Sequence, residues 1–184
     1  PPLLRRQRQM CIRDSRYGSE NRFDRNASRA GANWEFLDAL REKWNGNLIV
    51  KGIMDTDDAS RVQNAGVDAI WVSNHGGRQL DSSPPALSAL PKIRNTVGPN
   101  MPIIFDSGAR NGEDVVKALA LGANFVMLGR PIMMALAASS KKGLNNYLSL
   151  LKDEIGVVMA QLGINDLEKI SGDVLYDGIS KNIR

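Results

Sequence analysis

The chain has one cysteine, Cys11, and one histidine, His75, among its 184 residues. With no cysteine after position 11, the body of the chain can form neither a disulfide nor a thiolate metal site. A zinc site would have to be built from carboxylates alone, which is unusual. The sequence therefore predicts no disulfide framework and no metal centre.

Long apolar runs are absent as well. No stretch approaches the roughly 20 apolar residues that span a bilayer, and no secretory hydrophobic segment is present. These absences predict a soluble protein of the cytoplasm. With 42% hydrophobic and 24% charged residues, the composition is that of an ordinary globular chain.

The excess of positive charge lies at the N-terminus. Residues 1–31 carry eight arginines, no lysine and three carboxylates, whereas the other 153 residues carry 16 basic and 17 acidic side chains. The net charge of +4 therefore gives no reason to expect a nucleic-acid partner. Because residues 1–31 also lack apolar periodicity, we interpret them as a non-domain basic segment, disordered or non-native, and residues 32–184 as the folded part. A genuine basic arm that binds an anionic surface is the alternative.

Four short apolar runs alternate with helical patterns along the rest of the chain. The predicted strands are 48–50, 69–72, 102–105 and 125–128. The predicted helices are 34–44 with Asn33 as N-cap, 56–66 with Thr56 as N-cap, 86–96, 112–121, and a last one up to about 163 with a break at 142–143. The methionines of these elements are expected in the core, namely Met127, Met133, Met134 and Met159.

This alternation indicates an α/β fold with a parallel sheet. Polar or glycine-rich clusters follow all four strands, as at the catalytic face of a (β/α)₈ barrel, whereas a doubly wound sheet would gather its site at one switch point. A complete barrel needs roughly 200 to 250 residues or more, so the chain has about half of one.

The most informative motif, SNHGGRQLD at residues 73–81, directly follows the second strand. A histidine titrates near neutrality and can accept a proton, and an arginine can bind a carboxylate through two parallel hydrogen bonds. His75 and Arg78 therefore suit a small hydroxy acid, and the glycines between them bring the backbone close to a ligand. The plain alternatives are a strand-end histidine with a local hydrogen bond and a surface salt bridge of the arginine.

Charged residues and glycines also follow the other strands. Lys51 is costly to bury unpaired, so it faces an anion or a site, or else extends to solvent. Asp106 needs partners for its charge, or caps the next helix. The stretches 108–110 and 129–130 each combine a glycine with an arginine, a pattern typical of the phosphate sites of barrels.

Together these motifs resemble the FMN-dependent 2-hydroxy acid oxidoreductases, the family of glycolate oxidase, lactate oxidase, lactate dehydrogenase and mandelate dehydrogenase. The resemblance runs from about Trp34 to Ile170 and rests on LIVKG (48–52), SNHGGRQLD (73–81), DSGAR (106–110) and LGRP (128–131). It implies the C-terminal half, strands five to eight, of an incomplete (β/α)₈ TIM barrel. It also implies oxidation of an L-2-hydroxy acid to the 2-oxo acid on FMN, which oxygen, a quinone or a cytochrome reoxidises.

The resemblance implies a role for each site residue. His75 is the base that takes a proton from the substrate, Arg78 binds the substrate carboxylate, and Lys51 lies against the N1/C2-carbonyl edge of the flavin. The other cofactor-binding residues are Ser73, Asp106, Ser107, Gly108, Ala109, Arg110, Gly129 and Arg130. The implied partners are a small 2-hydroxy acid, an electron acceptor and, for the full-length enzyme, further copies of itself and the periphery of the inner membrane.

The family also uses parts that residues 1–33 do not contain. The aspartate that pairs with the histidine, the substrate-contacting tyrosines and several flavin contacts come from the first half of the family's barrel. We therefore expect this chain by itself to be inactive. Two further functions stay open: another FMN- or phosphate-binding barrel enzyme, which has no need of the His–Arg pair, and a non-catalytic half-barrel that keeps only phosphate affinity.

Overall fold

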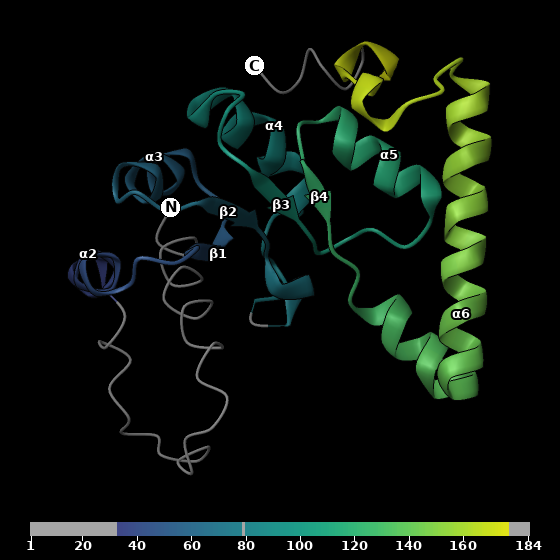
Figure 1. The fold of residues 1–184 in the computed structure, drawn as a ribbon, viewed down its shortest axis with the longest axis horizontal. Helices are drawn as coiled ribbons and strands as arrows, with labels where there is room; N and C mark the ends of the chain where they lie inside the picture. The colour runs from purple at the N-terminus through teal and green to yellow at the C-terminus, as the bar shows by residue number, and fades with distance from the viewer. Residues whose placement is uncertain (1–32, 79, 177–184) are drawn as a thin grey trace.

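The computed structural model describes residues 33–78 and 80–176, so the expectations for residues 1–31 concern a segment outside the described part. A parallel four-stranded sheet in the order β1-β2-β3-β4 forms its centre (Figure 1). The strands are β1 (Ile49–Ile53), β2 (Ala69–Val72), β3 (Ile103–Phe105) and β4 (Phe125–Val126). The helices are α2 (Trp34–Lys43), α3 (Thr56–Asn64), α4 (Ala86–Val97), α5 (Gly112–Ala120) and α6 (Arg130–Gln161), with short 3₁₀ turns at η1 (His75–Gly77), η2 (Leu167–Lys169) and η3 (Gly172–Val174).

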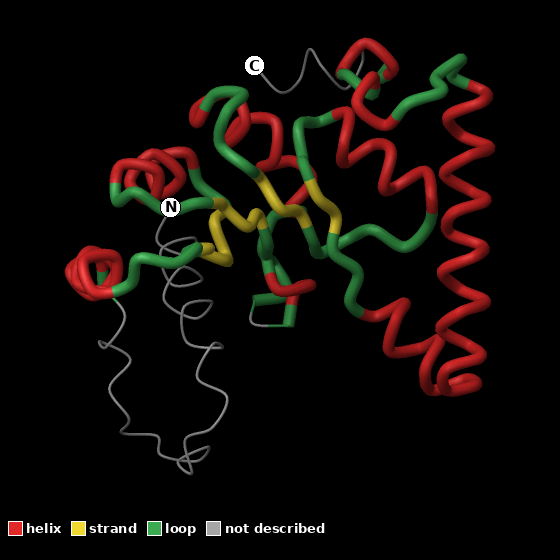
Figure 2. The backbone as a smooth tube through the Cα atoms, in the orientation of Figure 1, coloured by secondary structure: helices red, strands yellow, loops and turns green. Residues whose placement is uncertain are grey.

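Each strand pairs in parallel with the next one along the chain, and a helix forms each crossover. Figure 2 shows α3, α4 and α5 along one side of the strands. This sequential βα order confirms the predicted α/β fold with parallel strands and corresponds to part of a (β/α)₈ barrel.

The hydrophobic core lies between the sheet and these helices. Ile70 and Val72 of β2 and Ile103 of β3 have no exposed surface, and they pack with α3 and α4 residues such as Val62 and Leu90. Because side chains alternate along a strand, the residues between them point to the opposite face. That second face is open at the sheet edges, where Ile49 is 46% and Phe125 is 59% exposed.

The helix boundaries agree with the predicted patterns, with one corrected cap. Asn33 caps α2 as predicted, because its side chain accepts a hydrogen bond from the backbone N–H of Phe36. The N-cap of α3 is Asp55, one residue before the predicted cap Thr56. The Asp55 carboxylate accepts a hydrogen bond from the backbone N–H of Asp57.

The break in α6 also differs from the prediction. It falls at Ser139 and Ser140, which have non-helical backbone angles, and not at 142–143. Gly143 lies just after the break, where an added Cβ would be 2.0 Å from the Ala135 carbonyl oxygen. Gly143 thus allows the two segments of α6 to approach closely. The break itself precedes the glycine, at Ser139 and Ser140. None of the helices in the described part combines the length and apolarity of a membrane span.

The expected burial of the methionines is wrong at three of the four positions. Met133 and Met134 are 68% and 67% exposed and Met127 is 37% exposed, whereas Met159 is partly buried. Met127 lies at the carboxyl end of β4, and Met133 and Met134 lie in the first turns of α6. All three line a cavity. Apolar periodicity identifies a helix face but does not tell whether another element covers it.

Candidate active site

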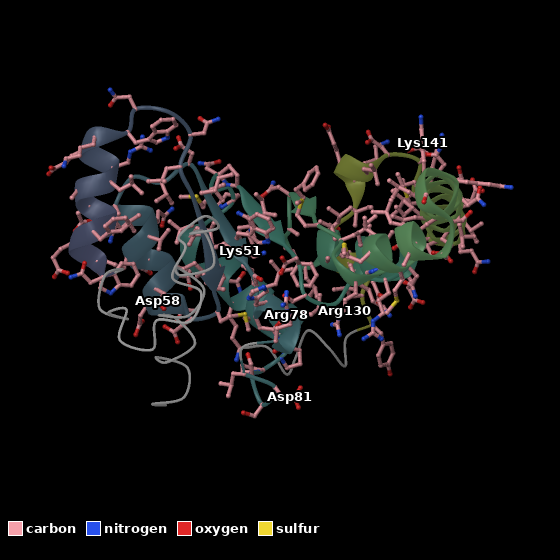
Figure 3. All side chains as sticks on the ribbon, turned by 90° about the horizontal axis from the view of Figure 1, so that it is seen from below. Lys51, Asp58, Arg78, Asp81, Arg130 and Lys141 are labelled. Atoms are coloured by element: carbon pink, nitrogen blue, oxygen red, sulfur yellow. The ribbon has the colours of Figure 1, made fainter. Side chains whose placement is uncertain are left out.

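The loops at the carboxyl ends of all four strands surround one cavity of about 670 Å³, a size typical of small-molecule sites. Ten of the eleven residues predicted to form the site line it. Figure 3 shows Lys51, Arg78 and Arg130, which come from three different strand ends, toward the middle of the molecule. Ser73, the eleventh, is fully buried behind the cavity wall. The cavity lining also includes Gly76, Met127, Pro131, Met133 and Met134.

Lys51 is held by two partners on the open face of the sheet. In the regular register of β1 with β2, Lys51 lies opposite Trp71, and a bulge at Gly52, whose φ is 99°, shifts the register only after Lys51. The Lys51 ammonium is 4.1 Å from the centroid of the Trp71 ring and 3.0 Å from an Asp106 carboxylate oxygen. The lysine therefore does not simply extend to solvent, and its charge has a defined place at the cavity.

The loop that carries the histidine has a strained backbone. His75, Gly76 and Gly77 have φ angles of 58°, 65° and 75°, three successive left-handed residues. For a non-glycine residue such as His75 this conformation costs about 1 kcal/mol or more, so the surroundings must hold it. The Ser73 hydroxyl accepts the His75 N–H at 3.1 Å, and the Ser107 hydroxyl accepts the Gly76 N–H at 3.0 Å.

Arg78 follows this turn and is exposed at the cavity. Its backbone N–H donates to the His75 carbonyl, which closes the 3₁₀ turn. Within the described residues its guanidinium forms no ion pair, so the surface salt bridge considered as an alternative is not seen there. Asn74 anchors the same loop, because its side-chain amide donates to the Pro84 carbonyl at 3.0 Å.

Asp106 forms an ion pair and does not cap a helix. One carboxylate oxygen pairs with Lys51, and the other accepts the Ser107 hydroxyl at 2.6 Å. The N-cap of α5 is Asn111, whose side chain accepts the N–H of Asp114, so the capping alternative for Asp106 is wrong. The Asp106 carboxylate therefore lies in the cavity lining, paired with Lys51.

The two glycine–arginine pairs border open space. A Cβ added at Gly108 or Gly129 would meet no heavy atom within 4 Å, and neither residue has a positive φ, so packing does not require glycine there. Gly129 is the N-cap of α6 and offers no side-chain cap to the first amides of that helix, and Gly129 itself lines the cavity. Both arginines, Arg110 and Arg130, line the cavity beside these glycines.

The charge of the cavity favours an anionic ligand. Four cationic side chains line it, Lys51, Arg78, Arg110 and Arg130, against one carboxylate, that of Asp106. Arginine guanidiniums and the amino ends of helices bind phosphate and carboxylate groups by charge-assisted hydrogen bonds. The cavity can therefore hold a ligand with a phosphate group together with a small carboxylic acid.

Two supporting residues were not predicted from the sequence. Trp71 orients Lys51, which becomes evident only once the strand register is known. Tyr147 of α6 donates its hydroxyl to the Arg110 carbonyl at 2.9 Å and so joins α6 to the loop before α5. Burial raises the pKa of the Tyr147 hydroxyl, and the nearby Glu154 and Asp114 carboxylates raise it further, so the group remains a donor at neutral pH.

The model of the FMN-dependent dehydrogenase family matches residues 3–177, nearly the whole chain. The chain belongs to this family. The matched range begins at residue 3, within the segment 1–31 that we interpret as non-domain. That interpretation stays a prediction, because residues 1–31 lie outside the described part of the structure.

Solved structures of mandelate-oxidising enzymes are similar to this chain. A crystal structure of (S)-mandelate dehydrogenase, described as a monotopic membrane protein, is 43% identical in sequence and has a TM-score of 0.76. The match covers 80% of this chain and 39% of the dehydrogenase chain. A soluble mutant of the membrane-associated (S)-mandelate dehydrogenase from Pseudomonas putida is 43% identical with a TM-score of 0.75, over 78% and 41%. Mandelate oxidase with 3,3-difluoro-2-hydroxy-3-phenylpropionic acid is 41% identical with a TM-score of 0.71, over 74% and 41%. The chain thus spans about two fifths of the length of these structures.

Proposed function

We propose that the cavity is the FMN and substrate site of an enzyme that oxidises an L-2-hydroxy acid to the 2-oxo acid. The observation that carries the proposal is the convergence of His75, Arg78 and both glycine–arginine pairs on one cation-rich cavity at the strand ends. A phosphate-binding barrel enzyme of another class would share the phosphate side of this cavity. It would not need the strained His–Arg loop beside it.

The residues present fit FMN. The open space at Gly108 and Gly129, with Arg110 and Arg130 beside them, suits the phosphate, and Asp106 with its neighbours suits the ribityl hydroxyls. Lys51 would place its charge by the flavin ring. When bound, FMN supplies the acceptor for the two electrons that leave the substrate. Ser73 lies behind the wall and contributes through the hydroxyl that holds His75.

The two residues of the strained loop act on the substrate. Arg78 binds the substrate carboxylate through its planar fork, which fixes the hydroxyl-bearing carbon relative to the imidazole. His75 takes a proton from the substrate and holds it on the imidazole while the electron pair leaves. Because the base and the carboxylate anchor are three residues apart on one closed turn, their backbones are held at a fixed separation.

The substrate, the electron acceptor and the assembly of the full-length enzyme belong to the same proposal. Mandelate is the first substrate to test, since the similar structures are mandelate enzymes; oxygen, a quinone and a cytochrome are the acceptors to compare. Peripheral attachment to the inner membrane is suggested by the neighbour described as monotopic. We infer that this chain alone binds FMN weakly and does not turn over, because one face of its sheet is open.

The test uses the full-length enzyme and the 184-residue chain side by side. FMN binding is measured by quenching of flavin fluorescence, and anaerobic bleaching of bound FMN is followed with mandelate, lactate and glycolate. Removing both phosphate-side cations, by Arg110→Ala with Arg130→Ala, should weaken FMN binding at least tenfold. The matched control Arg61→Ala, which breaks an ion pair with Asp38 and a ring contact with Trp34 outside the cavity lining, should not. Equal FMN affinity in both variants, or no bleaching by any hydroxy acid, would refute the proposal.

A further inference from the structure

Ser107 lies at the centre of a hydrogen-bond chain between the histidine loop and Lys51. Its hydroxyl oxygen is 2.6 Å from an Asp106 carboxylate oxygen, 3.0 Å from the Gly76 nitrogen and 3.3 Å from the Ser73 hydroxyl. The contacts with Gly76 and Ser73 join residues 31 and 34 positions apart in the sequence. No other described side chain makes hydrogen bonds to both the histidine loop and Asp106.

The chemistry of the partners fixes the direction of every bond in this chain. A carboxylate can only accept, so Ser107 donates its one proton to Asp106. A backbone N–H can only donate, so the Ser107 oxygen accepts from Gly76, and the Ser73 hydroxyl, which accepts from His75, donates onward to Ser107. The chain therefore runs from the His75 amide through two hydroxyls to the carboxylate paired with Lys51.

The backbone at Ser107 indicates that the hydroxyl is what the position requires. Ser107 has a φ of 75°, in the left-handed region that glycine adopts without strain. This chain has a serine there, although a glycine would relieve the backbone. The serine side chain adds little more than a hydroxyl to the backbone. The hydrogen bonds of that hydroxyl are therefore what a serine provides at this position and a glycine does not.

We propose that Ser107 is a positioning residue that holds the strained His75 loop in register with the Lys51–Asp106 pair. The role rests on the proposed function for its catalytic meaning, because it places the proton-accepting His75 relative to the charge assigned to the flavin. The hydroxyl touches neither substrate nor flavin in this role. It acts through the backbone amides of the loop and through Asp106.

The test begins with amide hydrogen exchange, which needs neither FMN nor substrate. Ser107→Ala should accelerate exchange of the Gly76 amide about tenfold, the loss of one hydrogen bond of typical net strength. Ser73→Ala should instead accelerate the His75 amide, because that serine accepts from it. Ser107→Gly removes the hydroxyl and also the backbone strain, so it should free the Gly76 amide while unfolding at a higher denaturant concentration than Ser107→Ala.

The kinetic arm uses the full-length enzyme. Both Ser107 variants should lower kcat about tenfold or more, and KM for the hydroxy acid should rise as well, because Arg78 lies on the same turn as His75. The controls Ser140→Ala and Ser140→Gly alter an exposed serine with a φ of 44° at the α6 kink and should change neither exchange at Gly76 nor kcat. Recovery of kcat in Ser107→Gly would assign the effect to strain and overturn the inference, as would unchanged exchange of the Gly76 amide in Ser107→Ala. Absence of hydroxy acid oxidation in the unmodified enzyme would refute the proposed function, while the exchange result would still decide the loop contact.

Discussion

Replacing Trp71 by leucine should lower the reduction potential of bound FMN. The indole ring lies 4.1 Å from the Lys51 ammonium, and a cation–π contact of this kind contributes about 0.5 to 2 kcal/mol. In the proposed site Lys51 stabilises the reduced, anionic flavin. Because the contact is present in both redox states, only the part of this free energy that holds the ammonium toward the reduced ring affects the couple, so the potential should fall by at most about 45 mV for two electrons.

The structure provides the controls for this prediction. The Trp71 indole N–H has no hydrogen-bond partner within the described residues, so the substitution breaks no hydrogen bond. Trp34→Leu removes the other described cation–π contact, that with Arg61 at 5.8 Å, which lies between α2 and α3 away from the cavity. Trp71→Phe keeps a ring and should give an intermediate potential. The potentials are measured by anaerobic dye equilibration on the full-length enzyme. A value for Trp71→Leu within about 5 mV of the unmodified enzyme, with FMN still bound, would refute the reasoning.

Three further predictions concern the His75 loop and the open sheet. His75→Gln should slow flavin reduction by about 10² to 10⁴-fold or more while FMN stays bound, as stopped-flow absorbance will show, and near-normal reduction would end the assignment of the base. Arg78→Lys keeps the charge but loses the fork, so KM for the hydroxy acid and Kd for oxalate should both rise; unchanged values would make the arginine structural. The isolated chain should self-associate or precipitate, because β1 and β4 each leave an edge unpaired among the described residues, and a stable monomer in light scattering would contradict this.

Much of the fold could be predicted because it depends on local patterns. The four apolar runs end in polar clusters, and their positions in the structure agree with the predicted ones to within a few residues. The convergence of the site also follows from the sequence, since the carboxyl ends of neighbouring parallel strands meet at one edge of a sheet. Asp55 was missed as a cap because two adjacent residue types, aspartate and threonine, can both fill that role.

The contacts within the site depend on information that local patterns do not carry. The pairing of Lys51 with Trp71 follows from the register of β1 against β2, which the sequence of either strand alone does not define. The bond from the Gly76 amide to Ser107 requires two loops from different strands to approach within 3.0 Å. The exposure of Met133 and Met134 depends on which elements cover α6, and the periodicity of a helix does not contain that information.

The arrangement separates the residues that stabilise the sheet from those that form the site. Ile70 and Val72 pack under the helices, while Trp71 between them points to the other face and supports Lys51. Because side chains alternate along a strand, the two residues that secure β2 in the core, Ile70 and Val72, also set the position of Trp71 between them. The histidine loop begins at the next residue, Ser73, which is fully buried and accepts the His75 amide. The strained loop therefore follows directly on a strand that packs in the core, which would keep His75, the proposed base, in place before a substrate binds.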